Sequence, residues 1–83
     1  LPGGIADKAL VNVRAVMRRA VEKGASSVIL AHNHPSGAVE PSKEDRLLTK
    51  ELKKMGQALS VDVLDHLIIG DNRCYSFREH GDL

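Results

Sequence analysis

Residues 32–45 read His-Asn-His-Pro-Ser-Gly-Ala-Val-Glu-Pro-Ser-Lys-Glu-Asp, and they join a predicted strand to a predicted helix. His32 and His34 are one residue apart, so on an extended backbone their side chains project to the same side. Ser42 and Asp45 follow across a turn rich in proline and glycine. Two neutral imidazole nitrogens and one carboxylate oxygen form a common ligand set for a catalytic zinc ion, with the fourth position left to water. The spacing therefore indicates a zinc site at His32, His34 and Asp45.

The segments on either side of this stretch predict a strand and a helix. The short apolar run over residues 27–31 predicts a buried central strand. His32 then lies at the carboxyl end of that strand, where open α/β sheets bind their ligands. Ser42 is a suitable N-cap for a helix over about residues 43–59, in which Gly56 either permits close packing or marks an early end. The apolar stripe of this helix consists of Leu48, Leu52, Met55 and Leu59.

The remaining segments complete an α/β pattern. Pro and Gly near the start predict a loop over residues 1–8, and the three- and four-residue spacing of apolar positions predicts a helix over residues 9–23 with Asn12 as N-cap. Residues 61–69 and 73–78 are predicted strands joined by a hairpin. The order αβαββ predicts an α/β sheet sandwich. The apolar positions of the first helix are Val13, Val16, Met17, Ala20 and Val21.

Each candidate ligand also has a purely structural interpretation. His32 and His34 are compatible with polar positions in a turn, and Ser42 with Asp45 resembles a capping box, in which the acid accepts a hydrogen bond from a backbone N–H. By itself the serine–aspartate pair favours the cap, and the joint spacing with the two histidines favours the metal site. We expect His66, within a buried strand, to be a hydrogen-bonded structural histidine rather than a fourth ligand.

The chain resembles a known family of proteins through these motifs. The pattern resembles the JAMM (MPN-plus) metalloprotease signature: His-x-His, then seven residues, Ser, two residues and Asp. The residues around this pattern resemble the bacterial RadC branch of that family. The resemblance implies a single JAMM/MPN-like α/β sandwich over residues 1–83, similar to the cytidine-deaminase fold, with a mixed sheet and flanking helices. It also implies Zn²⁺ bound by His32, His34 and Asp45, and a catalytic Ser42 that stabilises an oxyanion or orients water.

The function that the resemblance implies is hydrolysis of an amide bond by a zinc-activated water, as in a metallopeptidase or isopeptidase. The family carries a general-base glutamate on a strand upstream of the first helix, and we expect that strand to precede Leu1, so that this chain lacks its N-terminal strands. The alternative is a non-catalytic MPN-like binding or scaffold module associated with DNA repair. A glutamate on the upstream strand would favour the enzyme.

Composition narrows the expected partners. The chain has 12 Lys and Arg against 11 Asp and Glu, a formal charge of +1, and 2% aromatic residues, which argues against direct nucleic-acid binding. The basic residues of the first predicted helix are expected to form a solvated face. The sequence has no signal peptide and no long apolar span, so we expect no contact with a membrane. Its single cysteine, Cys74, is typical of a cytoplasmic protein, and we expect this thiol to be packed. We expect a protein or peptide substrate, and an exposed sheet edge leaves association of two copies open.

Overall fold

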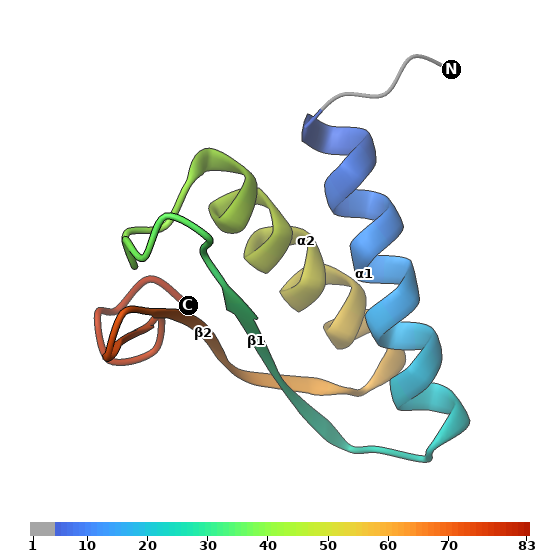
Figure 1. Ribbon diagram of the computed structural model, residues 1–83. Helices are drawn as coiled ribbons and strands as arrows, with labels where there is room; N and C mark the ends of the chain where they lie inside the picture. The colour runs from blue at the N-terminus through green and yellow to red at the C-terminus, as the bar shows by residue number, and fades with distance from the viewer. Residues whose placement is uncertain (1–4) are drawn as a thin grey trace.

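A computed structural model describes residues 5–83, with side chains from residue 12 onward, as two helices and a sheet (Figure 1). The order αβαββ is confirmed. Its elements are α1 (Ile5–Glu22), β1 (Ser27–Asn33), α2 (Lys43–Leu59), β2 (Asp62–Gly70) and β3 (Arg73–Ser76). None of the helices within the described residues is long and apolar enough to cross a membrane.

Helix α1 begins earlier than the sequence indicated. It starts at Ile5 rather than at residue 9, so Asn12 lies inside the helix and the prediction that it is the N-cap is wrong. Residues 5–11 contain alanine, leucine and lysine with no glycine or proline, and extending an existing helix through such residues is favourable. The expected loop is therefore too long; its residues 1–4 lie outside the described part of the chain. The helix ends at Glu22, and Gly24 follows with φ +65°, the left-handed conformation typical after a helix.

The sheet has the order β1-β2-β3, with β1 parallel to β2 and β2 antiparallel to β3. A parallel pair needs a long crossover, and α2 provides it. Among residues 5–83, β1 therefore lies at an edge of the sheet and not at its centre, and Ile29 on this strand is 58% exposed. The expectation of a buried central strand is wrong for the part of the chain described.

A β-bulge in β2 determines which of its side chains face the helices. Val28 pairs with Val63, but the next residue, Ile29, pairs with Asp65, so Leu64 is an extra residue on β2. Without it, Val63 and His66 would project to opposite faces, because strand side chains alternate. With it, both lie on the face that packs against the helices.

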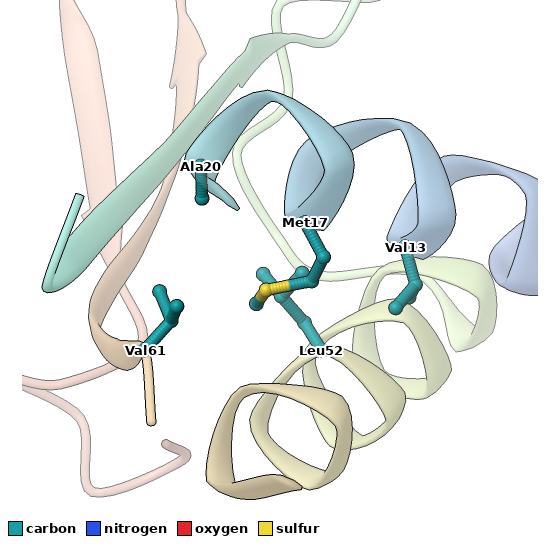
Figure 2. Packing of buried hydrophobic residues seen from close by; sticks show 5 residues of the cluster. All are labelled: Val13, Met17, Ala20, Leu52 and Val61. Carbon is teal, nitrogen blue, oxygen red and sulfur yellow. The ribbon is translucent and has the colours of Figure 1, made fainter. Parts of the chain in front are cut away.

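The apolar core lies between α1, α2 and the start of β2 (Figure 2). Val21 and Leu59, which we expected in the apolar stripes, are 55% and 43% exposed. They line an open groove between the C-terminal halves of the two helices, and all the residues that line this groove belong to α1 or α2. The buried cluster consists of Val13, Met17, Ala20, Leu52 and Val61.

Gly56 permits close packing, one of the two roles that the sequence left open. A Cβ atom at this position would lie 2.4 Å from the backbone oxygen of Val61, so no larger residue fits without a shift. The helix does not end there. It continues to Leu59, Ser60 adopts a left-handed φ of 58°, and the Val61 N–H donates to the Gly56 carbonyl at 2.8 Å.

The β2–β3 hairpin is confirmed, with Gly70 opposite Arg73, and β3 ends at Ser76 instead of residue 78. Cys74 is exposed, so the expectation of a packed thiol is wrong. It pairs with Ile69, which is 41% exposed, on the face of the sheet turned away from the helices.

Candidate metal centre

The three candidate ligands meet where the end of β1 faces the first turn of α2. The Nε2 atom of His32 lies 2.9 Å from one carboxylate oxygen of Asp45, and the Nε2 atom of His34 lies 2.9 Å from the other. The side chains of the two histidines are 31% and 19% exposed, and that of the aspartate is 9% exposed. The structure thus brings together the residues that the spacing singled out, and their role as ligands stays a prediction.

The turn that carries His34 is held against the β2–β3 hairpin. The His34 N–H donates to the Ile69 carbonyl at 3.0 Å. The Gly37 carbonyl accepts from the Asp71 N–H at 3.3 Å and from the Arg73 guanidinium at 3.2 Å. Gly70 makes this approach possible, because a Cβ atom there would lie 2.1 Å from the Gly37 oxygen. The position of the second histidine therefore depends on a hairpin more than 30 residues later in the chain.

Asp45 also belongs to a capping box, so the structural interpretation of this residue is confirmed. The Ser42 N–H donates to the Asp45 carboxylate at 2.8 Å, and the Asp45 N–H donates to the Ser42 hydroxyl oxygen at 3.1 Å. The same carboxylate still contacts both imidazoles. Cap and ligand are therefore compatible roles, and the cap fixes the side chain that faces the histidines.

The surroundings of Asp45 keep its carboxylate ionised. Burial by itself raises the pKa of this group, but hydrogen bonds from Ser42, and the positive charges of His32 and His34 when those imidazoles are protonated, bring the pKa below its ordinary value. The N-terminal end of α2 adds a favourable potential for negative charge. An ionised oxygen donor is therefore available at the site.

The donor atoms fit a metal cation. The Nδ1 atom of His34 lies 2.9 Å from the Ala38 carbonyl oxygen, which can only accept, so Nδ1 carries the proton. In neutral His34 the Nε2 atom then presents a lone pair to a carboxylate oxygen of Asp45. Two acceptors at hydrogen-bond distance repel each other unless a proton or a metal ion lies between them. Two imidazole nitrogens with a carboxylate match the preference of Zn²⁺.

His66 joins the cluster from the neighbouring strand. Its Nε2 atom lies 3.0 Å from Nδ1 of His32, and its Nδ1 atom is hydrogen-bonded to the Thr49 hydroxyl. Potential ligand atoms of His32, Asp45 and His66 all lie within 4.8 Å of one another. Burial, followed by the charge of His32, lowers the pKa of His66 to about 4. His66 is thus a buried, hydrogen-bonded histidine, as expected.

Neither Thr49 nor the contact between His32 and His66 was expected from the sequence. Thr49 lies four residues after Asp45, so it shares a helix face with the candidate ligand, and this spacing was the available signal. The contact of His66 with His32 had no such signal, because it depends on the bulge in β2. Asn12 proves to line the cavity beside the site instead of capping α1.

A cavity of about 490 Å³ opens over the cluster. Ala15 and Val16 of α1 and Leu48 of α2 form apolar parts of its wall, while Ser42 and Glu44 contribute polar groups next to Asp45. Apolar walls with a few convergent polar groups are typical of ligand sites. The cavity therefore has the character of a ligand site and lies next to the candidate metal ligands.

Other polar and basic side chains lie apart from these contacts. His80 is exposed and stacks on Tyr75 with ring centres 4.0 Å apart. The basic residues of α1 form the expected exposed face, on which Arg18 pairs with Glu22 at 3.5 Å. These basic residues are Arg14, Arg18, Arg19 and, just after the helix, Lys23.

Comparison with known proteins links this sequence to one family. The RadC-like JAB domain matches residues 1–82. A UPF0758 protein of Thermotoga maritima is 49% identical over 80 residues, which are 96% of this chain and 36% of the relative. UPF0758 proteins of Flavobacterium johnsoniae and Clostridioides difficile are 48% and 44% identical over 95% and 93% of this chain. The chain spans about a third of the length of these relatives.

Proposed function

This chain belongs to the RadC-like JAB domain family, and on that premise we propose that it is the metal-binding part of a zinc-dependent amide hydrolase, a peptidase or isopeptidase. The observation that carries the proposal is the placement of the His32 and His34 Nε2 atoms, each 2.9 Å from a different oxygen of Asp45. Such a set of one carboxylate and two imidazoles is typical of catalytic zinc sites, which leave a fourth position to water or substrate.

Each residue then has a definite role. A zinc ion in such a site supplies Lewis-acid chemistry, since it lowers the pKa of water toward about 7 and polarises a substrate carbonyl. Asp45 holds its negative charge toward the two imidazoles, oriented by the capping box with Ser42. The Ser42 hydroxyl lines the cavity and donates to the oxyanion that develops on the scissile carbonyl, a contact typically worth about 3 kcal/mol.

The proton-accepting group is a separate part of the proposal. Glu44 lines the cavity but lies on the first turn of α2, which does not match the place of the family's general base. We assign that role to a glutamate on a strand upstream of α1, as the family resemblance implies. That glutamate would take the proton of the attacking water and return it to the leaving amine.

The first test measures metal content. We expect about one zinc per chain by elemental analysis of the purified protein, and none in His32→Ala, His34→Ala or Asp45→Asn. The matched control is His80→Ala, which removes an exposed histidine outside the cluster and should keep the zinc. Zinc that is absent from the wild type, or indifferent to the three substitutions, would contradict the proposal.

The second test separates hydrolysis from binding. A longer version of the protein, extended upstream of Leu1, is incubated with peptide and isopeptide libraries, and cleavage is followed by mass spectrometry. Zinc-dependent cleavage that disappears on replacement of the upstream glutamate by glutamine supports the hydrolase. Zinc binding without cleavage of any amide would instead favour the non-catalytic binding or scaffold module.

A further inference from the structure

A chain of hydrogen-bonded side chains lies directly behind His32. Its Nδ1 atom is 3.0 Å from Nε2 of His66, the Nδ1 atom of His66 contacts the Thr49 hydroxyl, and that hydroxyl is 3.0 Å from the Asp45 carbonyl oxygen. This series of hydrogen bonds thus begins at the ring of His32 and ends on the backbone carbonyl of Asp45, and both residues are candidate ligands. It crosses from β1 through β2 to α2, so it also links the three elements that form the site.

The direction of each hydrogen bond follows from its last member. A backbone carbonyl only accepts, so the single hydroxyl proton of Thr49 points to the Asp45 oxygen. The Thr49 oxygen must then accept from Nδ1–H of His66. A neutral His66 with its proton on Nδ1 has a lone pair on Nε2, and this lone pair accepts from Nδ1–H of His32.

We propose that His66 is a positioning residue, which fixes the tautomer and the ring orientation of His32 so that the Nε2 lone pair of His32 is directed at the metal position. The inference rests on the proposed function, because it assigns His32 as a ligand. Partners of this kind on the second ring nitrogen are typical of metal-bound histidines, and losing one generally lowers metal affinity about 10- to 100-fold. Thr49 acts through His66 by fixing its tautomer in turn.

The packing of His66 suits positioning better than direct ligation. The side chain is fully buried, and its ring is stacked on Phe77 with ring centres 4.4 Å apart and planes 11° from parallel. The Phe77 N–H donates to the His66 carbonyl at 3.0 Å, and the His66 N–H donates to Asp65 at 2.7 Å. Both ring nitrogens are already in hydrogen bonds, so ligation by His66 would require breaking its bond to His32.

The two candidate ligands obtain the same tautomer from different acceptors. His34 donates from Nδ1 to a backbone carbonyl, that of Ala38, which no side-chain substitution removes. His32 donates to a buried side chain, His66, so its tautomer depends on a single residue of β2. Substitution at residue 66 should therefore affect His32 and leave His34 unchanged.

The test compares two substitutions of His66. Glutamine can place its amide oxygen near the position of Nε2 and keep an acceptor, whereas phenylalanine fills the space and stacks on Phe77 without an acceptor. Zinc affinity is measured by competition with a chelator, and histidine tautomers are measured by long-range ¹⁵N–¹H spectra of the metal-free protein at about pH 8, above the ordinary histidine pKa. Far-UV circular dichroism checks that each variant is folded.

We expect Nδ1–H on His32 in the wild type and in His66→Gln, and loss of that single tautomer in His66→Phe. Zinc affinity should fall about 10- to 100-fold in His66→Phe and largely recover in His66→Gln. If His66→Phe does not fold, Thr49→Val replaces it, because it removes the acceptor that fixes the His66 tautomer while keeping the shape of the side chain. In Thr49→Val, we expect the same two changes as in His66→Phe: loss of the single His32 tautomer and a lower zinc affinity.

Two results would overturn the positioning role. Unchanged zinc affinity and an unchanged His32 tautomer in His66→Phe, or in Thr49→Val when that variant takes its place, would mean that His66 only packs. Equal loss of zinc in the Gln and Phe variants, with the His32 tautomer intact, would mean that His66 is itself a ligand. A wild-type chain that binds no zinc contradicts the proposed function instead, and the tautomer spectra of the metal-free protein still decide whether His66 orients His32.

Discussion

Helix α2 contacts the rest of the protein at two places that differ in chemistry. In its first turn, the carboxylate of Asp45 meets two imidazoles and the backbone of Ser42, and each contact has a defined direction. Further along the helix, Leu52 packs among apolar side chains (Figure 2), and Gly56 lies against the backbone of Val61. Packing at the apolar end depends on buried area and volume, and the contacts at the polar end depend on which atom carries each proton.

From this difference we predict that α2 contributes to stability at one end and to zinc binding at the other. Changes at the apolar end should alter the free energy of unfolding and leave zinc affinity of the folded protein unchanged. Changes at the polar end should alter zinc affinity, and should alter stability mainly through the helix cap or through bound metal. The substitutions below test this separation.

Leu52→Ala should have the largest effect on stability. Leu52 is fully buried in the core, and such truncations typically lower the free energy of unfolding by about 2–5 kcal/mol. Urea unfolding followed by circular dichroism measures the change. Lys54→Ala, on the exposed side of the same helix, is the control and should change stability by less than about 0.5 kcal/mol. Reduced zinc affinity of the folded Leu52→Ala protein would break the separation of the two ends.

Zinc binding should raise the free energy of unfolding by an amount slightly smaller than the loss expected for Leu52→Ala. A ligand that binds only the folded state stabilises it by about 2.7 kcal/mol at a concentration 100 times its Kd. In Asp45→Asn, which keeps an oxygen for the helix cap, a 100-fold weaker Kd would reduce this gain to about 0.4 kcal/mol at the same concentration. Thermal unfolding with and without zinc measures both. An equal gain in the two proteins would argue for zinc binding elsewhere.

Gly56→Ala should destabilise the protein by about 1–3 kcal/mol, the usual effect of overpacking. In an exposed helix this substitution stabilises by about 1 kcal/mol, so the sign itself is informative. Here the new Cβ would lie 2.4 Å from the Val61 oxygen, which belongs to the backbone and cannot rotate away. Gln57→Ala, one residue along on the exposed side, is the control. A stabilised Gly56→Ala protein in urea unfolding would show that this turn can move.

Ser42→Ala should lower the free energy of unfolding by about 1 kcal/mol through loss of the N-cap. Ser42→Asn should restore most of it, since asparagine caps helices as well as serine does. Zinc affinity should change little in either variant, because the Ser42 N–H still donates to Asp45. Competition with a chelator measures the zinc affinity. A loss of affinity comparable to that of Asp45→Asn would assign the Ser42 hydroxyl a direct part in zinc binding.

Asp65→Asn should have the smallest effect, and the effect should depend on pH. Burial raises the pKa of Asp65, but hydrogen bonds from the Ser76 hydroxyl and from the Arg78 and His66 N–H groups bring it below its ordinary value. Because the folded pKa is lowered, this stabilisation is present above the unfolded pKa of about 3.9 and is lost as pH falls through the folded pKa. The difference in stability from wild type, less than about 1 kcal/mol at neutral pH because solvent screens this partly exposed carboxylate, should therefore vanish at low pH.

Unfolding in urea at several pH values between neutral and strongly acidic measures this difference. A gap between wild type and Asp65→Asn that stays constant with pH would mean that the contribution is not electrostatic. Asp71→Asn in the hairpin turn is the matched control, since Asp71 is an exposed aspartate outside this network.

Local patterns predicted much of this molecule. The apolar spacing and the N-cap predicted α2 with its observed ends, Lys43 and Leu59, and the turn residues predicted the hairpin between β2 and β3. Failures occurred where a segment's surroundings decide the outcome. The start of α1 was misplaced, Val21 and Leu59 were assigned to the core, and Cys74 was expected to be packed. Burial depends on what lies opposite a residue, and periodicity alone does not contain that information.

The sequence by itself determined the contacts made over a few residues. The alternation of strand side chains predicted that His32 and His34 project to the same side, and Ser42 reaches Asp45 because the first turn of a helix brings residues three apart together. Only the tertiary structure decided the contacts between distant segments. The extra residue Leu64 turns β2 so that its histidine meets His32. The packing of whole elements sets the strand register and the close approach of Gly70 to Gly37, so no short stretch of sequence encodes either one.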